Sequence, residues 1–350
     1  MTTDVWEQDN RALAADETVP WDAFAGKTVV VTGATGLIGR SLVGALLARE
    51  EYAPTGLCVV ALVRNPARLE ATFGAHKSLK VVAWDAADPG VSEQDVANAD
   101  YVFHCANMTD SASFVTQPVE VIETTVGGSR AMLELARRTG AHLCLLSTME
   151  TYGEVAGEAM LAEDKGGFLD AMSVRNSYPE AKRLSEALCA AYAAELGVCA
   201  NVARLAQTFG PGVSLTDRRV FAYFARCAIQ GEDIVLLTDG LKRNSYLYTA
   251  DATRGLLFVA ARGDAGRAYN VANDETFCTV RDMATLVITE FGAPGSTVRI
   301  ELDEEAAKVF RKGSVLRLDT SALQGLGWSA HYGLKEMYAR MIAGWNAQVA

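Results

Sequence analysis

The sequence predicts an α/β protein built on a doubly wound parallel sheet, with a smaller mixed α/β lobe toward the C-terminus. Two observations predict this fold. Between residues 27 and 205, short apolar runs alternate with amphipathic stretches, and the runs lack the period of two seen in half-exposed strands. Beyond residue 206 this rhythm stops, and shorter elements of both kinds follow. Strand and helix alternating in this way indicate parallel strands covered on both faces.

The apolar runs mark six expected strands of the main sheet: Thr28–Thr32, Leu57–Val63, Leu79–Trp84, Tyr101–Cys105, His142–Ser147 and Cys199–Leu205. Helices are expected near 37–50, 118–139 and 179–196. The lobe is predicted to contain three helices and three short strands: Val220–Gln230, Val280–Phe291, Leu334–Trp345, and Ile234–Leu237, Tyr269–Val271, Val298–Leu302.

Three segments follow from this pattern: an N-terminal arm (1–25), a nucleotide-binding domain (26–206) and a mainly substrate-binding lobe (207–350). The arm is acidic and polar, and we expect a partly ordered surface segment without a catalytic role. Ligands of open α/β sheets bind outside the carboxyl ends of the strands, so a cleft between sheet and lobe is the expected site.

Composition excludes several classes of partner. The 350 residues carry 32 Lys plus Arg against 43 Asp plus Glu, a formal net charge of −11, which disfavours nucleic acid and anionic membranes. The seven Cys form no Cys-x-x-Cys pair, and the four His are isolated, so no metal site is expected. No apolar run reaches the length of a membrane span, and the acidic residues 1–21 lack an apolar signal core. We expect a reduced, cytoplasmic, metal-free protein.

A glycine-rich loop follows the first expected strand. The sequence Gly33-Ala34-Thr35-Gly36-Leu37-Ile38-Gly39 leads directly into the helix 37–50. Gly33 permits a tight turn, Gly36 lets a pyrophosphate approach the backbone, and Gly39 lets helix and strand pack closely. The first helical turn then offers free N–H groups to phosphate, so Thr35, Leu37 and Ile38 join the predicted cofactor site. This context predicts a Rossmann-type domain that binds NAD or NADP.

The second and third strands suggest how the adenosine is held. Arg64 follows the second strand, where an acidic residue would favour a free ribose 2′-hydroxyl. An arginine there can pair with a 2′-phosphate, which slightly favours NADP, or it can lie across the adenine. Asp85, after the third strand, is a candidate acceptor for the adenine amino group; its alternative role is a turn residue.

A catalytic group is predicted on the helix 179–196. Tyr178 and Lys182 lie four residues apart, and thus on one helix face. A free tyrosine has a pKa of about 10. A nearby ammonium and an oxidised nicotinamide would both favour the phenolate, so we expect Lys182 to lower the pKa of Tyr178. Thr148 ends the fifth apolar run and can hydrogen-bond the substrate oxygen that Tyr178 deprotonates.

Together these motifs resemble an extended short-chain dehydrogenase/reductase of the nucleotide-sugar epimerase/dehydratase family, over about residues 27–345. The segments that carry the resemblance are Thr32–Gly39, His104-Cys105-Ala106, Ser147–Gly153, Tyr178–Arg183, Arg204-Leu205 with Phe209–Gly212, Tyr246–Asp251 and Tyr269–Val271. Within the family, the stretch from Tyr178 to Gly212 followed by Arg219-Val220 most resembles UDP-glucuronate decarboxylases.

The resemblance implies roles for individual residues. Tyr178 would take the proton of the sugar 4-hydroxyl while hydride passes to the nicotinamide, and Thr148 would assist. Lys182 would hold the nicotinamide ribose, and Ala106 would line the cofactor site. Glu150 matches a glutamate beside the sugar ring; its alternative is a solvated loop carboxylate.

Several positions depart from the family pattern. Met149 stands where 4,6-dehydratases have an acidic proton donor, which disfavours 4,6-dehydration. Asn244 replaces an arginine that contacts diphosphate or substrate, with Arg243 one place earlier, and Gln207 replaces a common asparagine. Gln207, Arg243 and Asn244 are therefore the expected substrate contacts in a remodelled site.

Three functions remain open at this point. The first is an epimerase or decarboxylase that oxidises a nucleotide-diphosphate sugar at C4 and reuses its cofactor. The second is a net NADPH-dependent reductase of a nucleotide-linked keto sugar, for example a CDP-linked ketose reduced to an alditol. The third, a non-catalytic nucleotide sensor, is disfavoured by the intact Thr148, Tyr178 and Lys182. The family also implies a homodimer formed through the helices 118–139 and 181–196.

Overall fold

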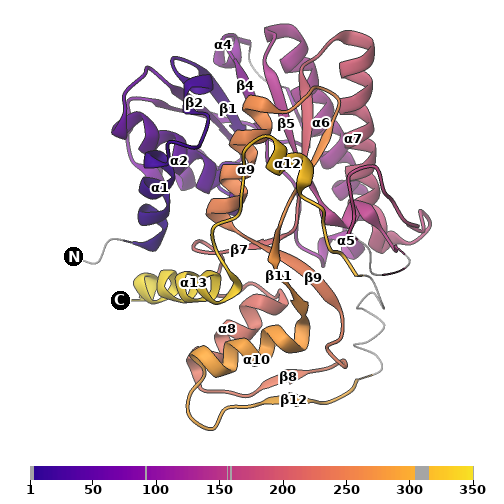
Figure 1. Ribbon diagram of the computed structural model, residues 1–350. Coiled ribbons are helices and arrows are strands. Elements are labelled where there is room, and N and C mark those ends of the chain that lie inside the picture. The colour runs from indigo at the N-terminus through magenta and orange to yellow at the C-terminus, as the bar shows by residue number, and fades with distance from the viewer. Residues whose placement is uncertain (1–3, 91–92, 156, 158–159, 304–314, 350) are drawn as a thin grey trace.

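Seven parallel strands form the central sheet (Figure 1). The computed structural model describes residues 4–90, 93–155, 157, 160–303 and 315–349. In space the strands follow the order β10-β6-β5-β4-β1-β2-β3, which confirms the doubly wound prediction. Their bounds are β1 Thr28–Thr32, β2 Cys58–Val63, β3 Leu79–Ala83, β4 Tyr101–His104, β5 His142–Thr148, β6 Ala200–Leu205 and β10 Ala268–Val271.

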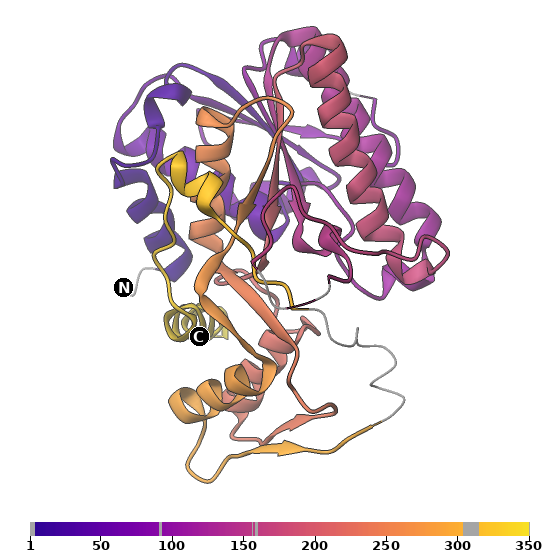
Figure 2. The same ribbon diagram turned by 45° about the vertical axis from the view of Figure 1, so that its right-hand side comes forward.

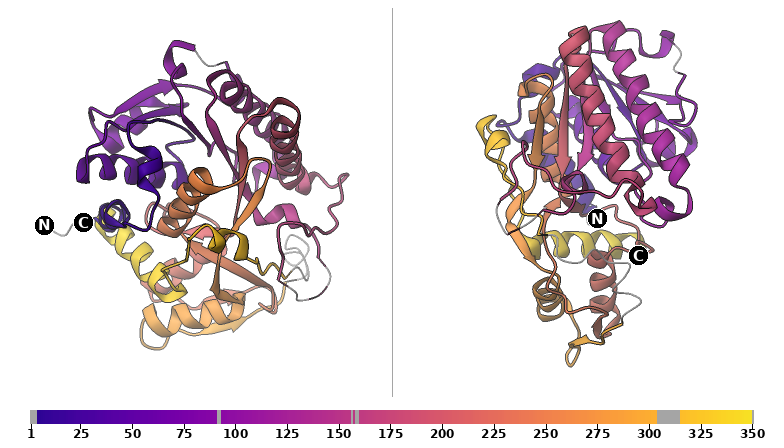
Figure 3. Two further views of the ribbon diagram at one scale, coloured as in Figure 1. Left: turned by 45° about the horizontal axis from the view of Figure 1, so that its top comes forward. Right: turned by 90° about the vertical axis from the view of Figure 1, so that its right-hand side faces the viewer.

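Helices cover both faces of this sheet (Figures 1 and 3). Within β1, Val29 and Val31 pack in the same core as Leu42, whereas Val30 packs on the opposite face with Leu133. This burial on both sides explains why the apolar runs do not alternate with polar residues. The helices are α2 Leu37–Tyr52, α3 Pro66–Phe73 and α9 Thr249–Arg262 on one face, with α4 Glu93–Val96, α6 Pro118–Thr139 and α7 Ser177–Leu196 on the other.

A smaller lobe with its own core lies beyond the carboxyl ends of the strands (Figures 1 and 2). Its three-stranded sheet has the order β11-β9-β7, and a two-stranded sheet pairs β12 with β8. The elements are β7 Gln207–Phe209, α8 Val220–Gln230, β8 Ile234–Leu236, β9 Arg243–Tyr248, β11 Asn273–Thr279, α10 Val280–Phe291, β12 Val298–Ile300 and α13 Leu334–Val349. The three helices predicted for this part of the chain are confirmed.

One strand of the C-terminal half belongs elsewhere than predicted. We assigned Tyr269–Val271 to the lobe, but β10 pairs in parallel with β6 and forms an edge of the central sheet. Helix α9 and the short α12 (Ser321–Gly325) accompany it and pack beside the main sheet. The chain therefore enters the lobe, returns to complete the sheet, and enters the lobe again.

The N-terminal arm is a packed element, so the expectation of a partly ordered surface segment was wrong. Helix α1 (Val5–Ala15) begins at Asp4, whose side chain accepts the Trp6 N–H at 3.2 Å, and it lies along α2. Trp21 and Phe24 of the following 3₁₀ turn (Trp21–Phe24) are buried in the main core. None of the described helices is long and apolar enough to cross a membrane.

Candidate active site

The glycine-rich loop joins β1 to α2 with backbone contacts that leave no room for side chains. Gly33 has φ +64°, and a Cβ atom there would lie 2.7 Å from the backbone nitrogen of Ala106. A Cβ atom on Gly39 would lie 2.3 Å from the carbonyl oxygen of Gly33. Gly36 caps α2 without a side chain, so the N–H groups of the first turn remain available to an anion. The loop therefore fits the diphosphate of a dinucleotide.

A buried hydrogen-bond chain fixes the neighbouring strand end. The Thr32 hydroxyl accepts the Ala106 N–H at 3.0 Å and lies 2.8 Å from Nδ1 of His104. Burial lowers the pKa of His104 to about 3, so its imidazole is neutral. We assign the unprotonated nitrogen to Nδ1, which lets the Thr32 hydroxyl donate to it. These two hydrogen bonds hold Ala106 against Gly33, and Ala106 is the residue for which the resemblance implied a cofactor contact.

The two residues predicted to contact the adenosine, Arg64 and Asp85, are both exposed, and Asp85 also accepts a hydrogen bond within its own turn. Arg64 is exposed directly after β2, and its strand pairs with β1 at the mouth of the glycine-rich loop. Asp85 is also exposed, and its Oδ1 accepts the Ala87 N–H at 3.0 Å. Asp85 thus stabilises its own turn through Oδ1, which is the alternative role considered for it. Oδ2 takes no part in that hydrogen bond.

The predicted catalytic residues lie on two elements that pack together, β5 and the start of α7. Thr148 is the last residue of β5, and Tyr178 and Lys182 lie in the first turns of α7, which packs against that strand. Nζ of Lys182 donates a hydrogen bond of 2.5 Å to the carbonyl oxygen of Leu146 in β5. The Thr148 hydroxyl accepts the Glu150 N–H at 3.2 Å, which leaves its own hydrogen available for a substrate oxygen.

The charges around Tyr178 differ from the sequence-based expectation. Burial, followed by the Glu150 carboxylate, raises the pKa of Tyr178, and Arg219 is the cation that opposes this shift. Burial lowers the pKa of Lys182 to about 8, against the attraction of Glu186. Nζ of Lys182 lies 6.0 Å from the centroid of the Tyr178 ring, but Lys182 is not among the groups that shift the pKa of Tyr178, so the expected lowering is not seen in the protein without cofactor.

Two residues that sequence reasoning missed complete the surroundings of Tyr178. Phe114 stacks on the Tyr178 ring, with centroids 4.6 Å apart and planes at 6°. Arg175 lies over Phe114, with Cζ 5.1 Å from the ring centroid, and its Nη2 contacts Glu150 Oε2 at 3.4 Å. The position of Arg175 three residues before Tyr178 was the available signal, since such spacing keeps two residues close in a helical turn.

The predicted substrate contacts lie in neighbouring strands of the lobe. Gln207 begins β7, which pairs with β9, where Arg243 and Asn244 are the first residues. Gln207 and Arg243 are half-buried, and Asn244 is buried. Met149 is also buried and belongs to the main hydrophobic core, so position 149 offers no proton donor to a ligand.

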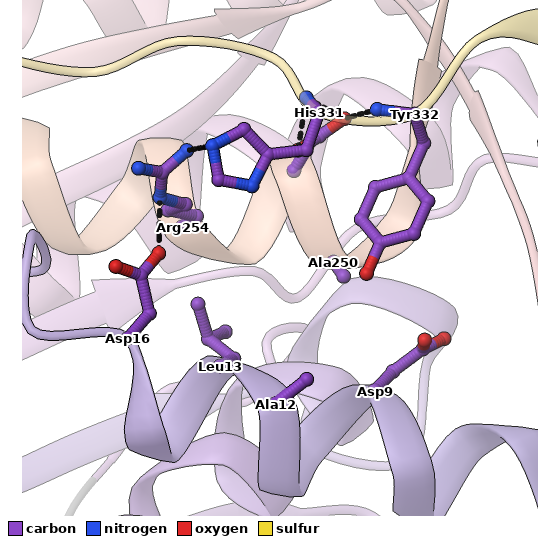
Figure 4. Close-up of a pocket in the computed structure, with 9 residues that line it drawn as sticks. Asp9, Ala12, Leu13, Asp16, Ala250, Arg254, His331 and Tyr332 are labelled. Carbon is purple, nitrogen blue, oxygen red and sulfur yellow. Dashed lines mark hydrogen bonds and ion pairs between the residues drawn. The ribbon is translucent and has the colours of Figure 1, made fainter.

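A polar cavity of about 60 Å³ lies away from these residues, between α1, α9 and residues 331–332 (Figure 4). Its carboxylates are already paired: Asp16 contacts Arg254 Nε at 3.0 Å, and Asp251 accepts the N–H groups of His331 and Tyr332. Such a volume suits water rather than a substrate. No group of His, Cys, Asp and Glu within the described ranges is arranged to hold a metal ion.

Comparison with known proteins, by family model and by sequence, points to one family of enzymes. A family model described as the NAD dependent epimerase/dehydratase family matches residues 29–272. The chain is 28% identical to UDP-glucuronic acid decarboxylase 2 of Arabidopsis thaliana over 328 residues, 93% of this chain and 69% of that protein. It is 30% identical to UDP-glucuronic acid decarboxylase 1 of Xenopus tropicalis over 270 residues, 77% of this chain and 61% of that protein.

Among solved structures, DesIV of Streptomyces venezuelae, a dTDP-glucose 4,6-dehydratase with NAD and TYD bound, has a TM-score of 0.77 at 25% identity. The superposition covers 91% of this chain and 97% of DesIV.

Proposed function

The chain belongs to the NAD-dependent epimerase/dehydratase family, and on that premise we propose that it oxidises a nucleotide-linked sugar transiently at C4 and regenerates its own cofactor. The observation that supports this proposal is the packing of α7, which carries Tyr178 and Lys182, against β5, which ends at Thr148. The chain's similarity to UDP-glucuronic acid decarboxylases supports an epimerase- or decarboxylase-like reaction through a 4-keto sugar.

The bound dinucleotide would supply a positively charged hydride acceptor. Tyr178 would accept the proton of the sugar 4-hydroxyl, since its hydroxyl is the acid–base group at this strand end. Thr148 would hold the same oxygen through the hydrogen that its bond to Glu150 leaves free. Lys182 would hold the nicotinamide ribose, and Glu150 would face the sugar ring.

The cofactor's 2′ position supports a finer proposal. Arg64 is exposed at the end of β2, and no described carboxylate forms an ion pair with it. A guanidinium in this position favours a 2′-phosphate, and therefore NADP over NAD. NAD is the cofactor in the DesIV structure, so titration of the protein with both cofactors is the direct comparison.

A second candidate function, net reduction of a nucleotide-linked keto sugar by NADPH, is favoured by the same exposed Arg64. A 4,6-dehydration is disfavoured because Met149 is buried in the core and cannot donate a proton.

Mass spectrometry of the nucleotides released on denaturing the purified protein tests the proposal. Near-stoichiometric NAD or NADP is expected, because an enzyme that regenerates its cofactor has no need to release it. A protein that is purified without dinucleotide, yet binds NADPH on titration, would contradict internal recycling and favour the reductase.

A further inference from the structure

We propose that Glu186 is a positioning residue for the reaction, whose carboxylate ties α7 to β5 and β6 and holds the Lys182 ammonium in place; this inference rests on the proposed function. Glu186 lies four residues after Lys182 in α7, and therefore on the same helix face. Its side chain is 11% exposed and bonds to residues of the central sheet. None of the sequence motifs that predicted the site includes Glu186.

The Glu186 carboxylate bridges two neighbouring strands at one level of the sheet. Ser147 of β5 stands opposite Arg204 of β6 in the parallel register. Oε1 of Glu186 accepts the Ser147 hydroxyl at 2.5 Å, and the two carboxylate oxygens accept three N–H bonds from Arg204 at 2.7–3.1 Å. One helical turn earlier, Lys182 donates to the carbonyl oxygen of Leu146, the residue before Ser147. Consecutive turns of α7 are thus bonded to consecutive residues of β5, which fixes how the helix lies against the strand.

Arg204 holds the Glu186 carboxylate in one position, because its remaining nitrogen is bonded as well. Nη1 donates to the Tyr152 hydroxyl at 3.1 Å and to the Glu163 carbonyl oxygen at 2.9 Å. Only 14% of the Arg204 side chain is exposed. An ion pair shielded from water in this way needs additional hydrogen bonds to offset its lost hydration, and each nitrogen of the guanidinium donates one here.

Lys182 depends on Glu186 for a compensating negative charge. Its side chain is buried, and the hydrogen bond that it donates goes to a neutral carbonyl. The titratable groups around its ammonium are Tyr178, Glu186 and Cys189 of α7, and His104 and Cys105 at the carboxyl end of β4. Burial raises the pKa of the phenol and of both thiols and lowers that of the imidazole, so these groups are uncharged and Glu186 is the anion of this set. Burial also lowers the pKa of Lys182 to about 8 against the attraction of Glu186, and a neutral residue at position 186 would let this pKa fall further.

The charge of Lys182 matters to the proposed reaction, in which this side chain holds the nicotinamide ribose. An ammonium offers three donors, and charge-assisted hydrogen bonds are roughly twice as strong as neutral ones. A neutral Lys182 would therefore orient the ribose more weakly. By keeping the ammonium charged, Glu186 extends the working range of the enzyme to higher pH.

Glu186→Gln tests the proposal, since it keeps the size of the side chain and an oxygen for Ser147 but removes the charge. The titration of Lys182 is followed by NMR in protein that contains isotope-labelled lysine, and its signal is identified by its absence from Lys182→Met. The midpoint should lie at least ~0.5 pH units lower than in the parent protein, as expected for loss of a nearby opposite charge. Glu186→Asp restores the charge and should return the midpoint most of the way. Glu180→Gln, which removes a carboxylate of the same helix that pairs with Arg183 at 3.9 Å, is the matched control and should leave it unchanged.

The pH profile of kcat/KM for UDP-glucuronate shows whether this charge serves the reaction. Its alkaline fall should begin at lower pH in Glu186→Gln and return toward that of the parent in Glu186→Asp. If Glu186→Gln does not fold because Arg204 is left unpaired, the double variant with Arg204→Met removes both buried charges and should show the same lowered Lys182 midpoint.

The outcomes separate the inference from the function. An unchanged Lys182 midpoint in Glu186→Gln would overturn the inference, whatever the enzyme acts on. A lowered midpoint with an unshifted kcat/KM profile would overturn the role of Glu186 in the reaction and leave the proposed function intact. A parent protein that turns over no nucleotide sugar would overturn the proposed function itself, and the Lys182 midpoint would still decide whether Glu186 keeps this ammonium charged.

Discussion

Tyr178 takes its surroundings from several separate segments of the chain. Phe114 of α5 (Ser113–Thr116) stacks on its ring, burial and then the Glu150 carboxylate raise its pKa, and Arg219 at the start of α8 opposes that shift. The phenol is therefore protonated at neutral pH until a positive charge is bound nearby. An oxidised nicotinamide bound nearby would add the positive charge that favours the phenolate.

Replacing Tyr178 by Phe removes the acid–base hydroxyl and keeps the ring that stacks on Phe114. Turnover of UDP-glucuronate, the first substrate to assay, should fall at least ~100-fold, because general acid–base catalysis contributes about that much or more. Thermal stability and bound dinucleotide should be unchanged. Tyr192→Phe on the same helix removes a hydroxyl that donates to Glu134 and should leave turnover unaffected. Near-normal activity of Tyr178→Phe would remove this hydroxyl from the mechanism.

Asp251 should make stability depend on pH. Burial raises its pKa to about 7, although the His331 and Tyr332 N–H groups and Arg254 oppose the shift. Between pH 4 and pH 7 the Asp251 carboxyl is therefore protonated in the folded protein but ionised in the unfolded chain, where the pKa of an aspartate is about 3.9. Stability from this group is complete below pH 4 and is lost as the pH rises toward 7, at about 1.4 kcal/mol for each unit of difference between the two pKa values.

Denaturant unfolding of the parent protein and of Asp251→Asn at several pH values measures this effect. Asparagine cannot ionise, so the stability of the variant relative to the parent should improve steadily from pH 4 to pH 7. Parallel pH profiles would show that Asp251 titrates normally. Asp9, another buried carboxyl whose pKa is raised, is present in both proteins, and its charge is one of the influences that raise the pKa of Asp251.

Two glycines of helix α2 allow close packing against two different segments of the chain. Gly39 lets the phosphate loop approach the helix, and Gly44 leaves room for α1. A Cβ atom on Gly44 would lie 2.4 Å from Nδ2 of Asn10 and 2.7 Å from a ring carbon of Trp6. Trp6 also lies over Arg40 in the first turn of α2, with Cζ 4.4 Å from the ring centroid. The arm is therefore fitted to the helix that follows the phosphate loop.

Gly44→Ala should destabilise the protein by about 1 kcal/mol and expose residues 1–25 to protease, because Asn10 and Trp6 must move from a packed interface. Gly127→Ala, inside α6, is the matched control: its nearest contact would be 3.9 Å away. The control should be neutral or up to ~1 kcal/mol more stable, since alanine is the better helix former. Thermal unfolding with limited proteolysis checks both. Equal stabilisation by both substitutions would show that α1 can move away from Gly44 without a loss in the free energy of unfolding.

At the scale of the whole molecule, the arm joins distant parts of the chain. Asp9 of α1 pairs with Arg340 of α13 and accepts the hydroxyl of Tyr248, while Asp16 pairs with Arg254 of α9. Arg254 is only 3% exposed, so its ion pair is largely shielded from solvent. Helix α1 therefore bonds both to α13 of the lobe and to Tyr248, and the residue after it, Asp16, pairs with α9 beside the central sheet; the Asp16–Arg254 ion pair is drawn in Figure 4.

The outer face of α6 and α7 supports the homodimer that the family implies. The two long helices lie side by side (Figure 3), and apolar side chains on this side of the molecule remain exposed: Val115 51%, Val119 66%, Ile122 42%, Leu184 50% and Leu196 48%. Exposed apolar side chains on neighbouring helices are typical of an interface. We propose that this face pairs with a second copy.

Sedimentation equilibrium at micromolar concentration should therefore give a dimer, and Leu184→Glu should shift it toward monomer by placing a charge in the interface. Ile229→Glu, at a similarly exposed apolar residue of α8 (43%), is the control and should leave the dimer intact. A parent protein that sediments only as a monomer would refute the prediction, as would equal dissociation by both substitutions.

The cytoplasmic location inferred from the scattered thiols stays a prediction.

Local features were predictable from the sequence because each is encoded within a few consecutive residues. The glycine spacing between β1 and α2, the four-residue step from Tyr178 to Lys182, and the non-alternating strands all express the short-range geometry of helices and buried strands. These patterns determined the fold class, the family and the core of the candidate site.

The tertiary structure alone decided what depends on contacts between distant residues. It placed β10 at the edge of the central sheet, packed the arm against α2, bonded Lys182 to a strand carbonyl, and brought Phe114 and Arg175 to Tyr178. None of these pairings leaves a periodic trace in the sequence, because each is selected by complementary shape and charge that exist only after the segments meet. The pKa of a buried group follows the same rule, since it depends on the neighbours that folding supplies.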